Sequence, residues 1–209
     1  MSLLTRRAAG FAAIALMLSA SAAIAQAPPA GPPARVRGTI EKVDGNVLTV
    51  KTLTGESTTL KLADNVRIGG LVKIGIADVK VNDYIGVSSM PQTDGTLKVI
   101  SVHIFPEAGR GTAEGHGPWD NRPGAMMTNA AVDTKVASNN GETLVLKYKG
   151  GGEQKAVVGP DAVVVRVVPG DKAELVPGAK IWAVAPKGPD GGLMAVVLYV
   201  GRDGLQPPM

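Results

Sequence analysis

The segment from Glu114 to Asp120 gathers several side chains that could do chemistry. It reads Glu114-Gly115-His116-Gly117-Pro118-Trp119-Asp120, and Met126 and Met127 follow it closely. An imidazole nitrogen with carboxylate oxygens is a ligand set for zinc, and a thioether sulfur suits copper(I). A single histidine without a second ligand at fixed spacing falls short of the usual zinc patterns. A metal site built from His116, Glu114, Asp120 and Met126 or Met127 is therefore the alternative, and a structural segment without a cofactor is favoured.

The structural interpretation rests on the composition of residues 106–127. This connector is rich in glycine and proline, which excludes a helix or a central strand. Trp119 is then expected to lie mostly buried in the seam between two domains, with Asp120 accepting hydrogen bonds from backbone amides. Pro118 and Pro123 stiffen the approach and lower the entropy lost on docking. The segment is predicted to be an ordered strap.

Catalytic motifs are absent from the rest of the sequence. There is no cysteine, no serine in a nucleophile elbow and no glycine-rich phosphate loop. One of the two histidines, His103, stands between Val102 and Ile104 in a strand-like run. Alternation places it on the opposite face from both, toward solvent or a shallow groove. We predict no catalytic or cofactor-binding residues and a protein that is not an enzyme.

The charge balance argues against nucleic acid as a partner. The chain has 22 basic and 18 acidic residues, and without Arg6 and Arg7 the basic excess falls to two. Single-stranded nucleic acid is usually held by aromatic platforms beside a basic groove. Aromatic residues make up only 3% of this chain. The expected partner is an envelope protein or a small ligand.

The N-terminus has the pattern of a secretory signal peptide. Arg6 and Arg7 precede an apolar run, and Ala23-Ile24-Ala25 matches an A-x-A cleavage site. We predict a signal peptide over 1–25, cleaved after Ala25, then a Pro-rich spacer over 26–34. No other segment has the length and hydropathy of a membrane span. The mature chain is expected in the periplasm.

From Arg35 onward, apolar and polar residues alternate with the period of β-strands. Asp44-Gly45 and Asp94-Gly95 interrupt the alternation as tight hairpins do. The strand that contains Leu60 and Leu62 is expected to end at residues 63–65, and a Gly-rich passage around Gly69 and Gly70 follows. A short helical turn is expected at Ile76-x-x-Val79.

The pattern repeats at a constant offset of 96 residues. The offset aligns Leu48 with Leu144, Ile85 with Ile181, and Asp94-Gly95 with Asp190-Gly191. We therefore predict an all-β chain of two tandem, small, five-stranded OB-like barrels, and an SH3-like barrel stays open as the alternative. The modules cover residues 35–105 and 128–203, and residues 204–209 form a tail.

The first module also carries a line of residues seen in a known group of proteins. These are Val36-x-Gly38-x-Ile40, Asp44-Gly45-Asn46-x-Leu48-x-Val50, Ile76-x-x-Val79-x-x-Asn82-Asp83-Tyr84-Ile85 and Asp94-Gly95-Thr96-Leu97. The chain thereby resembles an exported bacterial family of unknown function with tandem OB-like domains, whose relatives are sometimes labelled metal-transporter components. The resemblance implies a fold and an exported location, because these motifs specify turns and core rather than chemistry.

Three functions are compatible with these observations. The first is a non-enzymatic cell-envelope protein that binds an unknown ligand through barrel edges or the seam between domains. The alternatives are a periplasmic metal-binding or metal-handling accessory protein, and a structural or assembly factor of the envelope.

Overall fold

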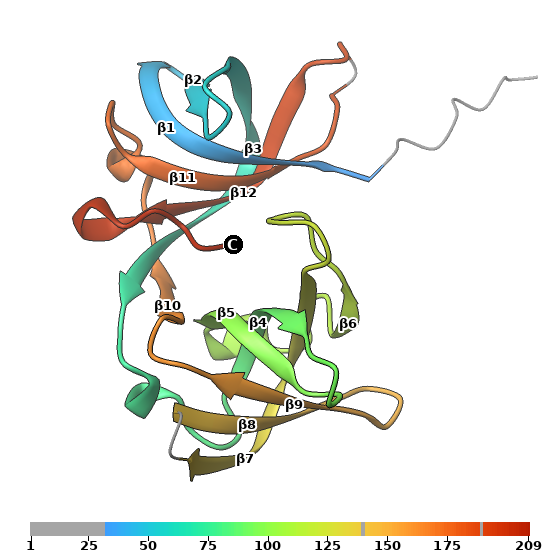
Figure 1. Cartoon of the computed structure of the whole chain (residues 1–209). Coiled ribbons are helices and arrows are strands. Elements are labelled where there is room, and N and C mark those ends of the chain that lie inside the picture. Colours follow the sequence, from blue (N-terminus) through green and yellow to red (C-terminus); the bar gives the residue numbers. More distant parts are fainter. Residues whose placement is uncertain (1–31, 139–140, 189) are drawn as a thin grey trace, which may run out of the picture.

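A computed structural model describes residues 32–138, 141–188 and 190–209, which form twelve strands and four single-turn 3-10 helices. The predicted signal peptide and most of the spacer lie outside the described residues. Figure 1 shows two small barrels, one above the other, with the last residues of the chain between them. The all-β prediction and the closed five-stranded, OB-like barrel are confirmed.

The first barrel combines strands from both ends of the chain. Its strands are β1 (Ala34–Asp44), β2 (Val47–Thr52), β3 (Ser57–Lys73), β11 (Lys180–Ala185) and β12 (Leu193–Gly201). They pair in the closed order β1-β2-β3-β12-β11-β1, with β3 and β12 parallel and the other neighbours antiparallel. Closure leaves no free edge on which another chain could add a strand.

The second barrel is built from the middle of the chain. Its strands are β4 (Tyr84–Pro91), β5 (Leu97–Ile104), β7 (Met126–Ser138), β8 (Gly141–Tyr148) and β9 (Gly152–Val158). They close in the order β7-β8-β9-β5-β4-β7, and β10 (Val163–Pro169) extends the pairing of β9 along β5. The two barrels therefore have the same strand order and the same parallel closing pair.

The prediction that residues 35–105 and 128–203 each close a barrel of their own is not confirmed. Each barrel takes its first three strands from one predicted module and its last two from the other. The sequence repeat fits barrels that combine strands of both modules as well as barrels closed within one module. Leu60 pairs with Leu193 in the first barrel, and Ala156 pairs with Leu97 in the second. Leu60 and Ala156 are 96 residues apart, and so are Leu97 and Leu193, so the pairing strands of the two barrels occupy equivalent positions of the repeat.

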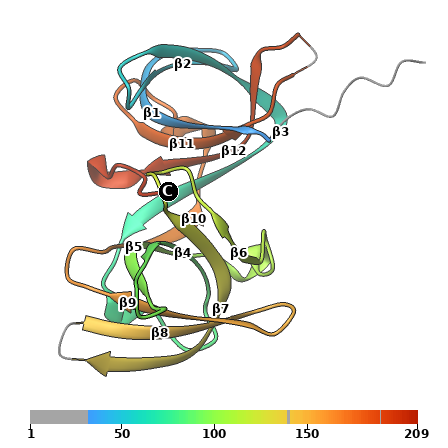
Figure 2. The same ribbon diagram turned by 45° about the vertical axis from the view of Figure 1, so that its right-hand side comes forward.

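The exchange runs through β3 and β10, which lie antiparallel where the barrels meet (Figure 2). The prediction that the third strand ends at residues 63–65 was wrong, because β3 continues through Gly69 and Gly70 to Lys73. These glycines serve close packing rather than a loop. A Cβ on Gly69 would lie 2.7 Å from the Tyr199 ring, and one on Gly70 would lie 2.7 Å from the Arg202 guanidinium. The strand carries the chain out of one barrel and into the other.

Each barrel has its own core of aliphatic side chains. Leu48 packs in the first core and Leu144 in the second, and both are fully buried. The short helical turn expected near residue 76 is η1 (Ile76–Asp78), and η3 (Lys172–Glu174) takes the matching place before β11. A third buried cluster, which includes Leu71, Val165, Val167, Trp182 and Met209, fills the space between the barrels.

Candidate ligand-binding cleft

The five candidate metal ligands do not converge on one point. His116 Nδ1 lies 2.8 Å from the Thr128 hydroxyl, and Glu114 Oε1 accepts a hydrogen bond from the Lys149 amide at 2.9 Å. Asp120 pairs with arginines of β1 instead of the backbone amides expected for it. Met126 and Met127 are neighbours in a strand, so their side chains leave on opposite faces. Within the described ranges, no group of three His, Asp or Glu side chains could hold a metal ion.

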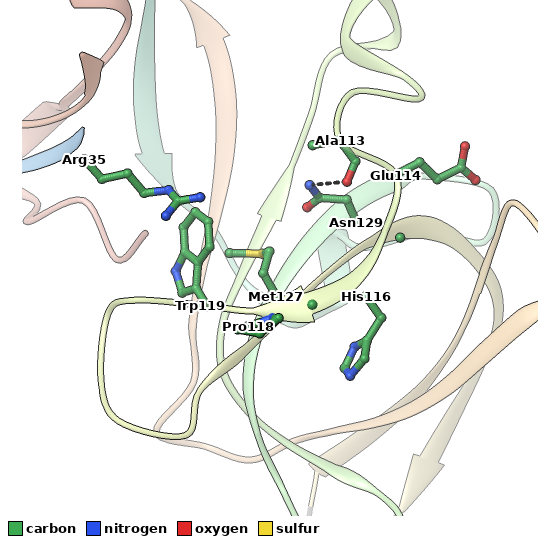
Figure 3. A pocket seen from close by; sticks show the side chains of 10 residues that line it. Arg35, Ala113, Glu114, His116, Pro118, Trp119, Met127 and Asn129 are labelled. Carbon is green, nitrogen blue, oxygen red and sulfur yellow. Dashed lines mark hydrogen bonds between the residues drawn. The ribbon is translucent and has the colours of Figure 1, made fainter. Parts of the chain in front are cut away.

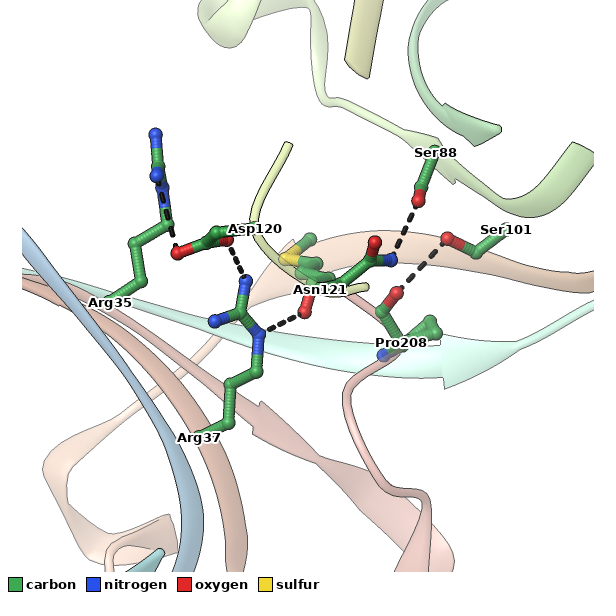
Figure 4. Close-up of polar contacts among 8 residues, drawn as sticks. Arg35, Arg37, Ser88, Ser101, Asp120, Asn121 and Pro208 are labelled. Atoms are coloured by element: carbon green, nitrogen blue, oxygen red, sulfur yellow. Dashed lines mark hydrogen bonds and ion pairs between the residues drawn. The ribbon is translucent and has the colours of Figure 1, made fainter. Parts of the chain in front are cut away.

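Asp120 ties the connector to the first barrel. Its Oδ1 accepts a hydrogen bond from Arg37 Nη2 at 2.6 Å, and its Oδ2 lies 3.4 Å from Arg35 Nη1 (Figure 4). Burial raises the pKa of the Asp120 carboxyl, but the hydrogen bond and charge of Arg37, together with Arg35, outweigh it and hold the pKa below its usual range. The carboxylate therefore stays ionised at neutral pH.

Other connector residues attach to the second barrel. The short strand β6 (Gly115–Pro118) pairs with β7, and the Tyr84 hydroxyl donates to the Thr112 carbonyl at 3.0 Å. Asn121 Nδ2 donates to the Ser88 hydroxyl at 2.7 Å. The loop that contains Pro123 is closed by the Trp119 amide, which donates to the Ala125 carbonyl. Residues 106–127 thus form an ordered connector with attachments to both barrels.

Trp119 lies in the seam as predicted, partly buried and in contact with residues of both predicted modules. It stacks on Trp182 of β11, with ring centroids 6.4 Å apart, and Trp182 stacks in turn on Tyr199 of β12 at 5.7 Å. The Arg35 guanidinium lies 4.4 Å from the Trp119 ring centroid (Figure 3). The three rings and the guanidinium form a column along the first barrel, while the Trp119 backbone belongs to a loop of the second.

His103 occupies the opposite wall. Its side chain leaves the second barrel on the face predicted by alternation. Of the two expected surroundings, solvent was wrong, because the side chain is 1% exposed, and it lines a cleft instead. Burial lowers the pKa of His103 to about 3, which keeps the ring neutral. Its Nε2 has no hydrogen-bond partner among the described residues.

Residues 205–209 enter the space between the barrels from a third direction. The Ser101 hydroxyl donates to the Pro208 carbonyl at 3.1 Å, and Arg37 Nε donates to the Met209 main-chain oxygen at 2.6 Å (Figure 4). Met209 itself is 4% exposed. This segment therefore joins a serine of one barrel to an arginine of the other.

A cleft of about 670 Å³ remains between these segments and the two barrels. Aromatic and aliphatic side chains dominate its wall, among them Phe105, Trp119, Trp182, Val184, Val197 and Tyr199. A second hollow of about 310 Å³, lined in part by Glu114 and His116, shares Arg35, Trp119 and Met127 with the cleft (Figure 3). Trp119 and Met127 therefore stand where the two hollows adjoin.

Sequence reasoning named Trp119 but missed Trp182, Tyr199 and Arg67, which also line the cleft. A usable signal was present. Ile181 and Ala183 point into the first core, as do Leu198 and Val200, so Trp182 and Tyr199 must point outward. Two large aromatic side chains on the outside of one small barrel indicate that another part of the protein covers that surface.

In the part of the chain that the structure describes, no helix is long and apolar enough to cross a membrane. Comparison with protein-family models, with curated proteins and with solved structures finds no match to this chain. The case for a function therefore rests on the geometry of the cleft.

Proposed function

We propose that this chain is a non-enzymatic binding protein of the cell envelope that holds a small ligand in the cleft between its barrels. The observation that carries the proposal is the cleft itself, about 670 Å³ in volume and walled mainly by apolar and aromatic side chains. Small-molecule sites have volumes of roughly 300–1,000 Å³ and commonly lie where two domains meet. The cleft has the size and position of such a site.

The polar atoms of the cleft support binding rather than bond-making chemistry. His103 Nε2 and the indole nitrogens of Trp119 and Trp182 are buried without partners among the described residues. Buried polar groups normally have hydrogen-bond partners, and these three unpaired atoms belong to residues that line the cleft. A nucleophile needs an adjacent base that is itself oriented, and among the described residues that line the cleft there is no Asp or Glu side chain to orient His103.

Export to the envelope rests on the N-terminal pattern, Arg6-Arg7 followed by the apolar run and Ala23-Ile24-Ala25. N-terminal sequencing of the protein recovered from the periplasm is expected to begin at Gln26. An intact N-terminus in the cytoplasmic fraction would refute export.

The neutral dye N-phenyl-1-naphthylamine tests the cleft directly, because its fluorescence rises in apolar surroundings. Both tryptophans of the chain line the cleft, so tryptophan emission reports the same event. We expect saturable binding of about one dye per chain, with quenching of tryptophan emission. Val197→Asp, which places a charge on the cleft wall, should weaken binding by about tenfold, or about 1.4 kcal/mol.

Val136→Asp is the matched control, because Val136 lies on β7, is 51% exposed and is not part of the cleft wall. It should leave dye binding unchanged. Circular dichroism and the thermal midpoint show whether each variant keeps its fold. Equal loss of binding in the two folded variants, or no saturable binding by the parent protein, would refute a ligand site in the cleft.

A further inference from the structure

The wall that the first barrel contributes to the cleft has a regular arrangement across four strands. Arg35 pairs in register with Val184, Val184 with Val197, and Val197 with Arg67. Residues paired directly across neighbouring strands point to the same face. The row is therefore an apolar floor of two valines with a guanidinium at each end, and all four residues line the cleft.

The two arginines are not equally available. Arg35 lies over the Trp119 ring and is paired with Asp120 at 3.4 Å. Arg67 is exposed and has no ion-pair partner among the described residues. Three strand spacings separate the two positions, about 14 Å along the sheet, so one small anionic group cannot reach both. Arg67 is the cation of the cleft that is left to pair with a ligand.

The electrostatic character of the cleft follows from its lining. Arg35 and Arg67 are its charged lining residues, and no Asp or Glu is among the described residues of its wall. The opposite wall contributes His103, which burial keeps neutral, and the Phe105 ring. Arg67 also lies close enough to Tyr199 for its charge to oppose the rise in the Tyr199 pKa caused by burial. The cation thus stands directly beside the aromatic column.

We propose that the cleft takes a small amphipathic organic anion, whose apolar body lies on Val184 and Val197 beside the aromatic column and whose carboxylate or sulfonate pairs with Arg67. This inference rests on the proposed function, since it names the class of ligand for the same cleft. A guanidinium binds an oxyanion with two accessible oxygens through two parallel hydrogen bonds. The apolar walls supply affinity, and Arg67 selects ligands that carry a negative charge.

Two dyes that differ by a single sulfonate test the inference. One is 8-anilinonaphthalene-1-sulfonate, and the other is N-phenyl-1-naphthylamine, the same ring system without the charge. We expect Arg67→Gln to weaken binding of the sulfonate dye by about fivefold, the scale of one exposed ion pair of about 1 kcal/mol, and to leave the neutral dye unchanged. Raising the salt concentration to 0.5 M should weaken only the sulfonate dye, because exposed charges are screened.

Lys51→Gln is the charge-matched control, because Lys51 is an exposed cation of β2 that does not line the cleft. It should leave both dyes unchanged. If Arg67→Gln affects both dyes equally, or neither, while the neutral dye still binds in the cleft, the anion preference is wrong and the proposed binding function stands. If the neutral dye does not bind the parent protein at all, the proposed function fails with it.

Discussion

The two barrels share a strand order, yet the walls that they turn toward each other have opposite character. Because the strand registers of the two barrels match, each position on one wall has an equivalent position on the other. On the first barrel the outward residues of β11 and β12 are large and mostly apolar: Trp182, Val184, Val197 and Tyr199. On the second barrel the matching residues of β4 and β5 are small or polar: Gly86, Ser88, Ser101 and His103.

The difference shows how one scaffold forms an asymmetric cleft. The first wall contributes Trp182 and Tyr199 to the aromatic column, and Trp119 stacks on Trp182. The second wall leaves room and hydrogen-bonding groups for inserted segments, because Ser88 accepts from Asn121 and Ser101 donates to Pro208. The inward positions are alike: Ile85 and Ile181 are both fully buried in their cores. The walls differ only where side chains leave the barrel, and there they create the site.

The largest expected effect comes from changing side-chain volume at one pair of equivalent positions, Trp182 and Gly86. Trp182→Ala empties the centre of the aromatic column and should lower the free energy of unfolding by about 3–5 kcal/mol. Gly86→Ala should cost about 1–2 kcal/mol by overpacking. A Cβ there would lie 2.7 Å from Asn129 Oδ1 and 3.1 Å from the Phe105 ring.

Chemical denaturation measures both variants, and Val81→Ala, at a valine that is 58% exposed, is the neutral control. A cost for Trp182→Ala no larger than that of the control would show that the column does not stabilise the interface.

The next effect concerns His103, which matches Tyr199 on the other wall. The folded protein keeps the imidazole neutral down to a pKa of about 3, while in the unfolded chain it protonates near 6.5. As the pH falls from 6.5 toward 3, the unfolded state therefore binds the additional proton, and stability declines. Between pH 7 and pH 4 this group should remove about 3 kcal/mol of stability.

The His103→Gln variant lacks the titrating imidazole, so its free energy of unfolding should fall less over the same pH range. The difference in free energy of unfolding between parent and variant should therefore narrow by about 3 kcal/mol at pH 4. His116 is present in both proteins and cancels in the comparison. Parallel stability curves for parent and variant between pH 7 and pH 4 would contradict a neutral, buried His103. So would an NMR titration of this ring with a midpoint near 6.

The smallest effect on the free energy of unfolding is expected at Trp119, which belongs to the connector rather than to the wall of the first barrel. Trp119 is half-buried and belongs to a loop, so Trp119→Ala should lower the free energy of unfolding by about 1–2 kcal/mol, less than Trp182→Ala. Trp119→Phe keeps an aromatic ring on Trp182 and should recover part of the loss. A loss as large as that of Trp182→Ala would mean that the connector, rather than the wall, holds the barrels together.

Much of the fold followed from local patterns. Alternation and the Asp-Gly pairs predicted strands and hairpins, and Gly45 and Gly95 both adopt the positive φ that such turns require, 57° and 81°. The same alternation correctly placed His103 on the face opposite Val102 and Ile104. The candidate metal residues were adjacent in sequence, but their side chains reach Thr128, Lys149 and Arg37, three partners that sequence spacing cannot indicate.

By itself, the sequence determined the strand type, the turns, the five-stranded barrel and which side chains point inward, because these depend on local backbone preference and a period of two. Only the tertiary structure decided which hairpin closes which barrel, since Leu97 and Leu193 offer equivalent edges to the partner strands. That choice brings Trp182, Tyr199 and Arg67 opposite His103. An outward side chain on an isolated strand faces water, and it lines a cleft only when a second barrel is held against it.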